Sequence, residues 1–315
     1  MPSFSEYAGL EPVEGDQSLP QWLHEATTRA PLYGTLPDRG WPAHCHEAGD
    51  LEAASARLVD PFGGRHDPSR RPDAFVQVAQ DLSLFWALGV DDLARMAGVL
   101  ADAWEQLGIV EGDRIALYDY ATSPMVVFAS RAFIPHLGAG AADILGCLPV
   151  CNDGLPELAD RCVHILEYVQ PSFLFIDADV VEPLIRVLNP STPRPRRIVV
   201  TADERPASSD QISDWASGLG AEVVQMLRCD AALFLAAPCP SQSMTFHPSP
   251  RAFVVEVLNP DGSKRSNDAE GRLAISNLAL RSSIVARYAA SFEGSVRTGP
   301  CRCGSEAAGV VITNA

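Results

Sequence analysis

The chain has 315 residues, of which 47% are hydrophobic and 20% are charged, a balance typical of a globular protein rather than a disordered one. Its net charge of −16 argues against a nucleic-acid partner, because phosphate binding requires clustered Lys and Arg. We expect no membrane span and no secretory signal, since no long apolar run is present and the N-terminus is acidic. A cytoplasmic protein follows, whose eight cysteines are expected to be thiols or metal ligands rather than disulfides.

The first 70 residues read as an N-terminal segment of helices and loops. A short helix is expected at 20–30, followed by a stretch rich in Pro, Gly and His with a helical element at 51–58. The clearest helix spans 91–107 and ends at Gly108. Its apolar residues recur at helical spacing: Leu93, Met96, Ala97, Leu100, Trp104 and Leu107.

Strands and helices then alternate. Strands are expected at 114–118, 143–150, 172–176, 197–201 and 222–226, with helices near 124–137, 155–169, 180–188 and 210–218. Such alternation is typical of βαβ units with parallel strands. We therefore predict an α/β core with a parallel sheet over residues 71–235.

The pattern changes after Pro238, where helical periodicity ends. Short strands are expected at 253–258, 272–277 and 283–288, separated by turns such as Asn-Pro-Asp-Gly-Ser. We predict a smaller antiparallel β lobe over residues 236–315.

Four residues flank this β section and form a candidate metal site. Cys239 and His247 precede it, and Cys301 and Cys303 follow it with one residue between them. Three sulfurs and one imidazole are a standard tetrahedral ligand set for zinc. The alternative is four unrelated residues in a cysteine-rich chain, because Cys-x-Cys is less specific than Cys-x₂-Cys. A redox pair is less favoured, since neither the Cys-x-x-Cys spacing nor a βαβ context is present.

Four segments carry a family resemblance: LGIVEGDRIALYDY (107–120), FVVEVLNPDGS (253–263), DAEGRLAISNL (268–278) and RTGPCRCG (297–304). They resemble the phenylacetate-CoA ligase and coenzyme F390 synthetase-like branch of the adenylate-forming acyl- and aryl-CoA ligases, and the likeness runs from about residue 20 to 305. The resemblance implies the N-terminal-domain fold of enzymes that form an acyl- or aryl-AMP and then a thioester. It also implies a structural zinc held by Cys239, His247, Cys301 and Cys303.

The resemblance fails where the family's chemistry resides. The phosphate-binding loop corresponds to VQVAQDLS (76–83), which has no glycine or lysine and places Asp81 where phosphates would lie. Ala231 stands where the family has a magnesium-binding Glu, and Phe292 stands where it has a ribose-binding Asp. The sequence ends at Ala315, so we also expect the family's C-terminal lid, with its catalytic Lys, to be absent.

These losses predict a degenerate ligase-like protein without ATP-dependent ligase activity of its own. We expect it to act as a scaffold, partner or regulatory subunit in acyl or aryl acid metabolism or biosynthesis, as a homodimer or in complex with another biosynthetic protein. Two alternatives stay open: ATP-independent chemistry on an acyl or aryl small molecule in the old pocket, and an atypical ligase completed by a separate lid protein. The sequence assigns no catalytic residue.

Overall fold

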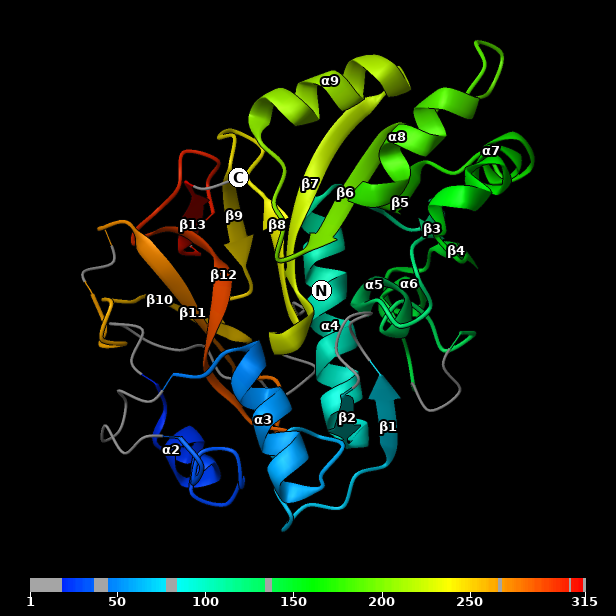
Figure 1. The fold of residues 1–315 in the computed structure, drawn as a ribbon. Helices are drawn as coiled ribbons and strands as arrows, with labels where there is room; N and C mark the ends of the chain where they lie inside the picture. Colours follow the sequence, from blue (N-terminus) through cyan, green and yellow to red (C-terminus); the bar gives the residue numbers. More distant parts are fainter. Residues whose placement is uncertain are drawn as a thin grey trace.

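A computed structural model describes residues 19–36, 45–77, 84–133, 138–265, 268–305 and 307–313. One continuous sheet runs through the molecule (Figure 1). Its strands are β3 (Arg114–Tyr118), β4 (Leu148–Asn152), β5 (Phe173–Asp177), β6 (Arg197–Asp203), β7 (Glu222–Cys229), β8 (Phe234–Pro238), β9 (Thr245–Pro248), β10 (Phe253–Val257), β11 (Gly271–Asn277), β12 (Val285–Arg297) and β13 (Gly309–Ile312). Their order across the sheet is β10-β11-β12-β13-β9-β8-β7-β6-β5-β3-β4.

The parallel half of the sheet carries helices on both faces. Strands β4, β3, β5, β6 and β7 pair in parallel. The principal helices are α4 (Val90–Gln106), α7 (Ala159–Tyr168), α8 (Ala178–Val187) and α9 (Ser209–Leu219). Ile115 and Leu117 of β3 share a buried cluster with Trp104 of α4, whereas the alternate residues Ala116 and Tyr118 share another with α7, α8 and α9. Because successive strand side chains point to opposite faces, α4 lies across the sheet from the other three helices (Figure 1).

The antiparallel half continues the same sheet instead of forming a separate one. Strand β8 folds back against β7, and β9, β13, β12, β11 and β10 follow as antiparallel neighbours. Strand β13 is last in the chain yet lies between β9 and β12, with Val310 opposite both Phe246 and Val296. The connection from β12 to β13 therefore returns beside β9, which brings Cys301 and Cys303 near His247.

The N-terminal segment packs against the antiparallel half. It contains α2 (Gln21–Thr27), α3 (Ala48–Leu58) and a hairpin of β1 (Ala74–Gln77) with β2 (Phe85–Leu88). The Tyr33 hydroxyl accepts a hydrogen bond from the Ala286 N–H at 2.7 Å and donates one to the Ile284 carbonyl at 3.2 Å. The buried Arg65 donates to the Ala231 carbonyl at 3.2 Å. These contacts fix the segment to β12 and to the turn after β7.

Two predicted elements differ from the structure. The strand expected at 143–150 is wrong in its first half, because α6 (Ala141–Leu145) occupies that position. The Asp143 carboxylate accepts a hydrogen bond from the Gly140 N–H at 2.9 Å, which favours a helix start, and Gly146 ends the helix with a φ of 70°. The helix expected near 124–137 is reduced to α5 (Pro124–Val127), and residues 134–137 lie outside the described residues.

Two short 3₁₀ helices complete the described elements, η1 (Pro156–Leu158) before α7 and η2 (Asp230–Ala232) after β7. Among the described residues, no helix combines the length and the apolar character that crossing a bilayer requires.

Candidate functional sites

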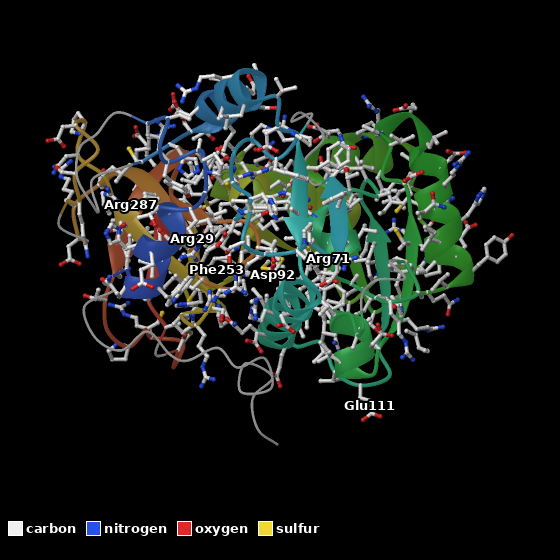
Figure 2. All side chains as sticks on the ribbon, turned by 90° about the horizontal axis from the view of Figure 1, so that it is seen from below. Arg29, Arg71, Asp92, Glu111, Phe253 and Arg287 are labelled. Atoms are coloured by element: carbon white, nitrogen blue, oxygen red, sulfur yellow. The ribbon has the colours of Figure 1, made fainter. Side chains whose placement is uncertain are left out.

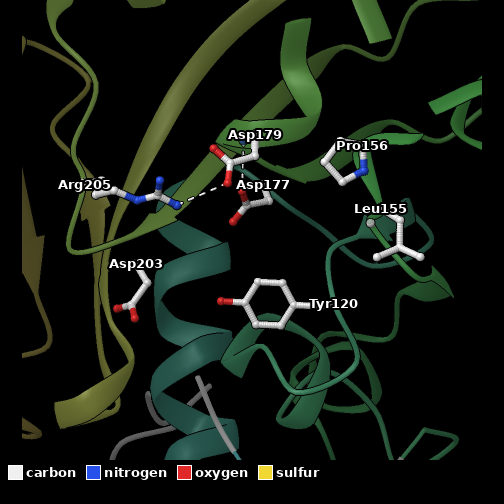
Figure 3. Close-up of a pocket in the computed structure, with 8 residues that line it drawn as sticks. Tyr120, Leu155, Pro156, Asp177, Asp179, Asp203 and Arg205 are labelled. Atoms are coloured by element: carbon white, nitrogen blue, oxygen red, sulfur yellow. Dashed lines mark hydrogen bonds and ion pairs between the residues drawn. The ribbon is translucent and has the colours of Figure 1, made fainter. Parts of the chain in front are cut away.

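A cavity of about 450 Å³ opens where the parallel strands end. Its lining comes from the carboxyl ends of the strands and the segments after them: Tyr120, Gly154, Leu155, Pro156, Asp177, Asp179, Asp203 and Arg205. Figure 3 shows Tyr120 and Asp177 pointing into the space, with Arg205 paired to Asp179 at 3.3 Å. The carboxyl edge of an open parallel sheet is where α/β proteins most often bind ligands.

A buried arginine network lies next to this cavity. Arg228, at the end of β7, is fully buried, and its Nη1 lies 2.8 Å from Asp119 Oδ2 while its Nε lies 3.0 Å from Asp230 Oδ1. Its Nη2 donates to the Tyr120 hydroxyl at 2.7 Å and lies 3.6 Å from Asp177 Oδ2. The guanidinium is thus enclosed by carboxylates from three strand ends, so its charge is already compensated.

Burial sets the protonation behaviour of these carboxyl groups. Burial, then the neighbouring Asp119, raises the pKa of Asp177 to about 6. Burial also raises the pKa of Asp230 well above its usual value, although Arg228 opposes the shift. Burial by itself would lower the pKa of Arg228, but Asp230 and Asp119 outweigh it and raise that pKa. Arg228 is therefore held as a cation.

The positions matched to the family's ATP-binding residues are buried and apolar. Ala231 lies in η2 with 4% exposure, and Phe292 lies in β12 with 3% exposure. The carboxylate of Asp230, the residue before Ala231, already forms an ion pair with Arg228. Of the segment 76–83, only Val76 and Gln77 belong to the described β1, and Asp81 lies outside the described residues.

Arg287 and Tyr288, two neighbouring residues of β12, both have partners within the protein. Arg287, which Figure 2 shows on the antiparallel half of the sheet, is buried and donates through Nε to Glu256 Oε2 at 3.0 Å. The Tyr288 hydroxyl donates to Glu204 Oε1 at 2.8 Å. Both side chains therefore form hydrogen bonds that stabilise the fold.

The four predicted metal ligands come together in the structure. Cys239 directly follows β8, His247 lies within β9, and Cys301 and Cys303 lie in the connection from β12 to β13. Their donor atoms all lie within 4.8 Å of one another. The Cys239 and Cys301 sulfurs are 3.6 Å apart, and the Cys303 sulfur is 3.3 Å from His247 Nε2.

These distances fit a tetrahedral metal site. Zn–S bonds of about 2.3 Å and Zn–N bonds of about 2.0 Å give a tetrahedron whose edges are roughly 3.5–3.8 Å, close to the two observed separations. A disulfide is excluded at 3.6 Å, and the four sulfur and nitrogen donors match the preference of zinc. Burial raises the pKa of Cys239, but hydrogen bonding, foremost with Ser241, lowers it to about 6, which favours the thiolate that a metal requires. The pKa of Cys303 is instead raised, first by burial, so this thiol would give up its proton only on binding the metal.

A second group of metal-type residues is satisfied without an ion. Asp203, Glu204 and Cys229 also have donor atoms within 4.8 Å of one another. The Cys229 thiol donates to Glu204 Oε1 at 3.0 Å, and Asp203 Oδ1 accepts from the Asp230 N–H at 2.7 Å. Burial, then Glu204, raises the pKa of Cys229 well above its usual value, so the thiol keeps its proton and is a poor ligand.

Comparison with known proteins finds similarity in structure and none in sequence: no protein-family profile matches the chain, and no curated protein matches it. The open conformation of 2-hydroxyisobutyryl-CoA ligase, in complex with 2-HIB-AMP and CoA, superposes with a TM-score of 0.73 at 15% identity. That alignment covers 93% of this chain and 72% of the ligase. The alignment with the same ligase in its postadenylation state covers 91% of this chain and 64% of the ligase.

More distant structures share the same architecture. The amide bond synthetase McbA from Marinactinospora thermotolerans has a TM-score of 0.51 at 13% identity, over 76% of this chain and 48% of McbA. The N-terminal subdomain of NpsA from Klebsiella oxytoca, in complex with 3-hydroxyanthranilyl-AMSN, has a TM-score of 0.50 at 15% identity, over 79% of this chain and 63% of that one. This chain therefore has the fold of the N-terminal domain of the adenylate-forming ligases.

Proposed function

We propose that the chain is a non-catalytic member of this fold, acting as a scaffold, partner or regulatory subunit in acyl or aryl acid metabolism. The observation that carries the proposal is the charge at the carboxyl edge of the sheet. Asp177, Asp179 and Asp203 line the cavity, and the guanidinium of Arg205 is paired with Asp179. A triphosphate at this edge would face carboxylates, and two like unit charges about 4 Å apart repel by about 4 kcal/mol at an effective dielectric of about 20.

The residues that stand where the family has its ATP-binding side chains support the same proposal. Ala231 and Phe292 offer no carboxylate for magnesium or ribose, and both are buried. Arg228, at the end of β7, is compensated by Asp119 and Asp230. The printed sequence has a single lysine, Lys264, on the connection between β10 and β11. Charge stabilisation of a transferring phosphoryl or adenylyl group requires such donors at the reacting atoms.

Titration calorimetry with ATP and Mg²⁺, and separately with AMP and CoA, tests this proposal. We expect no heat of binding for ATP·Mg²⁺ and no pyrophosphate exchange with a panel of aryl and fatty acids. Micromolar ATP binding would contradict the proposal and would favour the reading as an atypical ligase completed by a separate lid protein.

A second candidate function is ATP-independent chemistry on an acyl or aryl small molecule. The observation that favours it is the cavity of about 450 Å³, which has an apolar side at Leu155 and Pro156. A volume of this size accommodates a small organic ligand. Thermal-shift screening with aryl and acyl acids and their CoA thioesters identifies ligands of the cavity. Incubation with each ligand and mass spectrometry of the products then distinguishes the two functions, because turnover of any of them would establish an enzyme.

We also propose that Cys239, His247, Cys301 and Cys303 hold a structural zinc. When bound, the ion would cross-link the end of β8, strand β9 and the β12–β13 connection, contributing stability without an open coordination position. His247 Nε2 faces Cys303, and Cys239 faces Cys301, so all four donors point to one centre.

A further inference from the structure

The Cys₃His cluster is unevenly shielded from solvent. Cys239 and His247 are 7% and 2% exposed, whereas Cys301 and Cys303 are half-buried. Of the four ligands, Cys301 and Cys303 are therefore the more exposed residues and the ones that a dissolved oxidant meets first. Thiolate sulfurs that solvent reaches are the ones that oxidants attack.

Cys239 is the partner best placed for Cys301. Their sulfurs are 3.6 Å apart, so a disulfide of about 2.05 Å requires an approach of about 1.5 Å. The backbone on both sides is anchored, since the Cys239 N–H donates to the Thr245 carbonyl at 2.7 Å and the Cys301 N–H donates to the Ser305 carbonyl at 2.8 Å. Cys301 and Cys303 are separated by one residue, so a bond between them would close a small, strained ring.

A hydrogen bond holds the Cys301 sulfur in this position. Gln242 Nε2 lies 3.4 Å from Cys301 Sγ, and Gln242 Oε1 accepts from Arg297 Nη1 at 2.8 Å. The amide is thus oriented by β12 and directs its N–H at the sulfur. This arrangement fixes Cys301 beside Cys239.

We propose that the cluster is an oxidant-releasable metal clasp, in which a peroxide converts Cys239 and Cys301 to a disulfide and the metal leaves. The inference rests on the metal occupancy proposed above and adds its regulation. Cys239 and Cys301 supply two of the four donors, and a disulfide sulfur is a poor ligand because the thiolate is the metal-binding form.

The chemistry balances with hydrogen peroxide as the oxidant. The Cys301 thiolate attacks one peroxide oxygen, forms a sulfenic acid and expels hydroxide. The Cys239 thiolate then attacks the Cys301 sulfur and expels a second hydroxide, and two protons convert both hydroxides to water. The two sulfurs lose two electrons, the peroxide gains them, and the metal ion does not change its oxidation state.

Oxidation exchanges one kind of cross-link for another. The disulfide keeps the end of β8 joined to the β12–β13 connection, whereas the link from His247 to Cys303 is lost with the metal. The turn at 301–304, closed by a hydrogen bond from the Gly304 N–H to the Cys301 carbonyl at 2.9 Å, is then tied at one end only.

Metal content, chelator absorbance and peptide mapping of the full chain test the proposal together. Protein purified under reducing conditions is assayed for zinc, then treated with hydrogen peroxide from equimolar to large excess beside a chromogenic zinc chelator. We expect loss of the bound zinc, a peptide linked through Cys239 and Cys301 under non-reducing conditions, and recovery of zinc binding after a phosphine reductant and zinc are added.

Two variants sharpen the test. His247→Ala removes one donor and keeps both sulfurs, so it should hold little zinc before treatment and still form the Cys239–Cys301 disulfide on oxidation. Cys151→Ser removes a half-buried thiol on β4 outside the cluster and should release zinc as the parent does. If His247→Ala does not fold, alkylation mapping of the parent during peroxide titration gives the same information.

Three results would each overturn the clasp: zinc retained at excess peroxide, a Cys301–Cys303 disulfide, or oxidation without any disulfide. None of them would contradict the proposal that the four residues hold a structural zinc. Protein that holds no zinc before oxidation would overturn the metal site itself. The zinc assay before treatment therefore separates failure of the metal site from failure of the clasp.

Discussion

Arg228 and Asp119 form an ion pair with both side chains fully buried, with 2.8 Å between Nη1 and Oδ2. The pair joins the end of β7 to the residue after β3, across the two strands between them. Removing two charges from water costs several kcal/mol for each ion, so the pair is maintained by its additional hydrogen bonds. Arg228 Nη1 donates two of these bonds, to the hydroxyl oxygens of Ser123 and Thr201 at 3.2 and 3.1 Å.

Arg228→Met should lower the free energy of unfolding by about 3–5 kcal/mol, because it leaves the Asp119 carboxylate buried without its partner. Combining it with Asp119→Asn should cost less than the two single changes added together, since the stranded charge is removed. Urea denaturation measures all three. Arg205→Met, whose partner Asp179 is exposed, is the matched control and should change stability by less than about 1 kcal/mol. Equal losses for Arg228→Met and Arg205→Met would show that the buried pair has no special role.

The raised pKa of Asp177 predicts that the protein becomes less stable as pH rises. Burial raises its folded-state pKa from 3.8 to about 6. The contribution of Asp177 to the free energy of unfolding is therefore complete below about pH 4 and is lost as pH rises through 6. The shift corresponds to roughly 2–3 kcal/mol above pH 6. Asp177→Asn, which keeps an oxygen for the Asp179 N–H, should therefore be more stable than the parent at pH 8.

The comparison is made by urea denaturation between pH 5 and pH 8, conditions that bracket the raised pKa. Asp179→Asn, on the exposed side of the same cavity, serves as the control. An Asp177→Asn protein that loses stability equally at both ends of the range would contradict the assignment of this group.

Zinc content tests the Cys₃His site directly. Protein purified without added metal should contain about one zinc per chain, and Cys301→Ser should lose it. The variant should also unfold at a lower temperature, because metal binding by such sites is worth on the order of 10 kcal/mol in folding. Cys151→Ser, which changes a thiol outside the cluster, should keep both its zinc and its stability. Zinc retained by Cys301→Ser would place the ion elsewhere.

A protein that keeps this scaffold without its chemistry is expected to keep a surface for a partner, either a second copy or another biosynthetic protein. Light scattering coupled to size exclusion should give twice the mass of 33.8 kDa for a homodimer. A pull-down with biosynthetic proteins of acyl or aryl acid metabolism should identify a hetero-complex. A strictly monomeric protein without such a partner would favour the ATP-independent enzyme.

The parallel core could be predicted from sequence because its strands are short apolar segments between amphipathic helices. The predicted strands at 172–176, 197–201 and 222–226 match β5, β6 and β7 to within three residues at each end. Strands β8, β9 and β13 were not predicted, since their pairing joins residues distant in sequence. Local apolar pattern does not specify that β13 inserts between β9 and β12.

The two sites differ in how much the sequence revealed. The Cys₃His cluster could be predicted because its residue types have few common roles and because the flanking segments resemble a known family. The Arg228 network could not, since a lone arginine in an apolar strand gives no sign of burial. One signal was present: an aspartate ends or follows β3, β5, β6 and β7. These carboxylates meet because parallel strands end at one edge of the sheet.

The final prediction is that restoring single family residues will not produce an active ligase. Ala231→Glu and Phe292→Asp each introduce a carboxylate at a position with 4% or 3% exposure, so each should destabilise the protein as well as add a ligand atom. ATP binding requires the phosphate loop, the magnesium carboxylate and the ribose carboxylate to act on one ligand, and the contributions of such groups are strongly non-additive.

Pyrophosphate exchange with a panel of aryl and fatty acids should therefore stay at background for each single variant and for the double variant. A glycine-rich loop in place of residues 76–83, added to both substitutions, is the smallest change from which we expect any adenylate. Circular dichroism of each variant establishes that a silent protein is folded. Exchange above background by the unmodified chain would mean that the segment 76–83 is misaligned with the family's loop, and the ligase reading would replace the one proposed here.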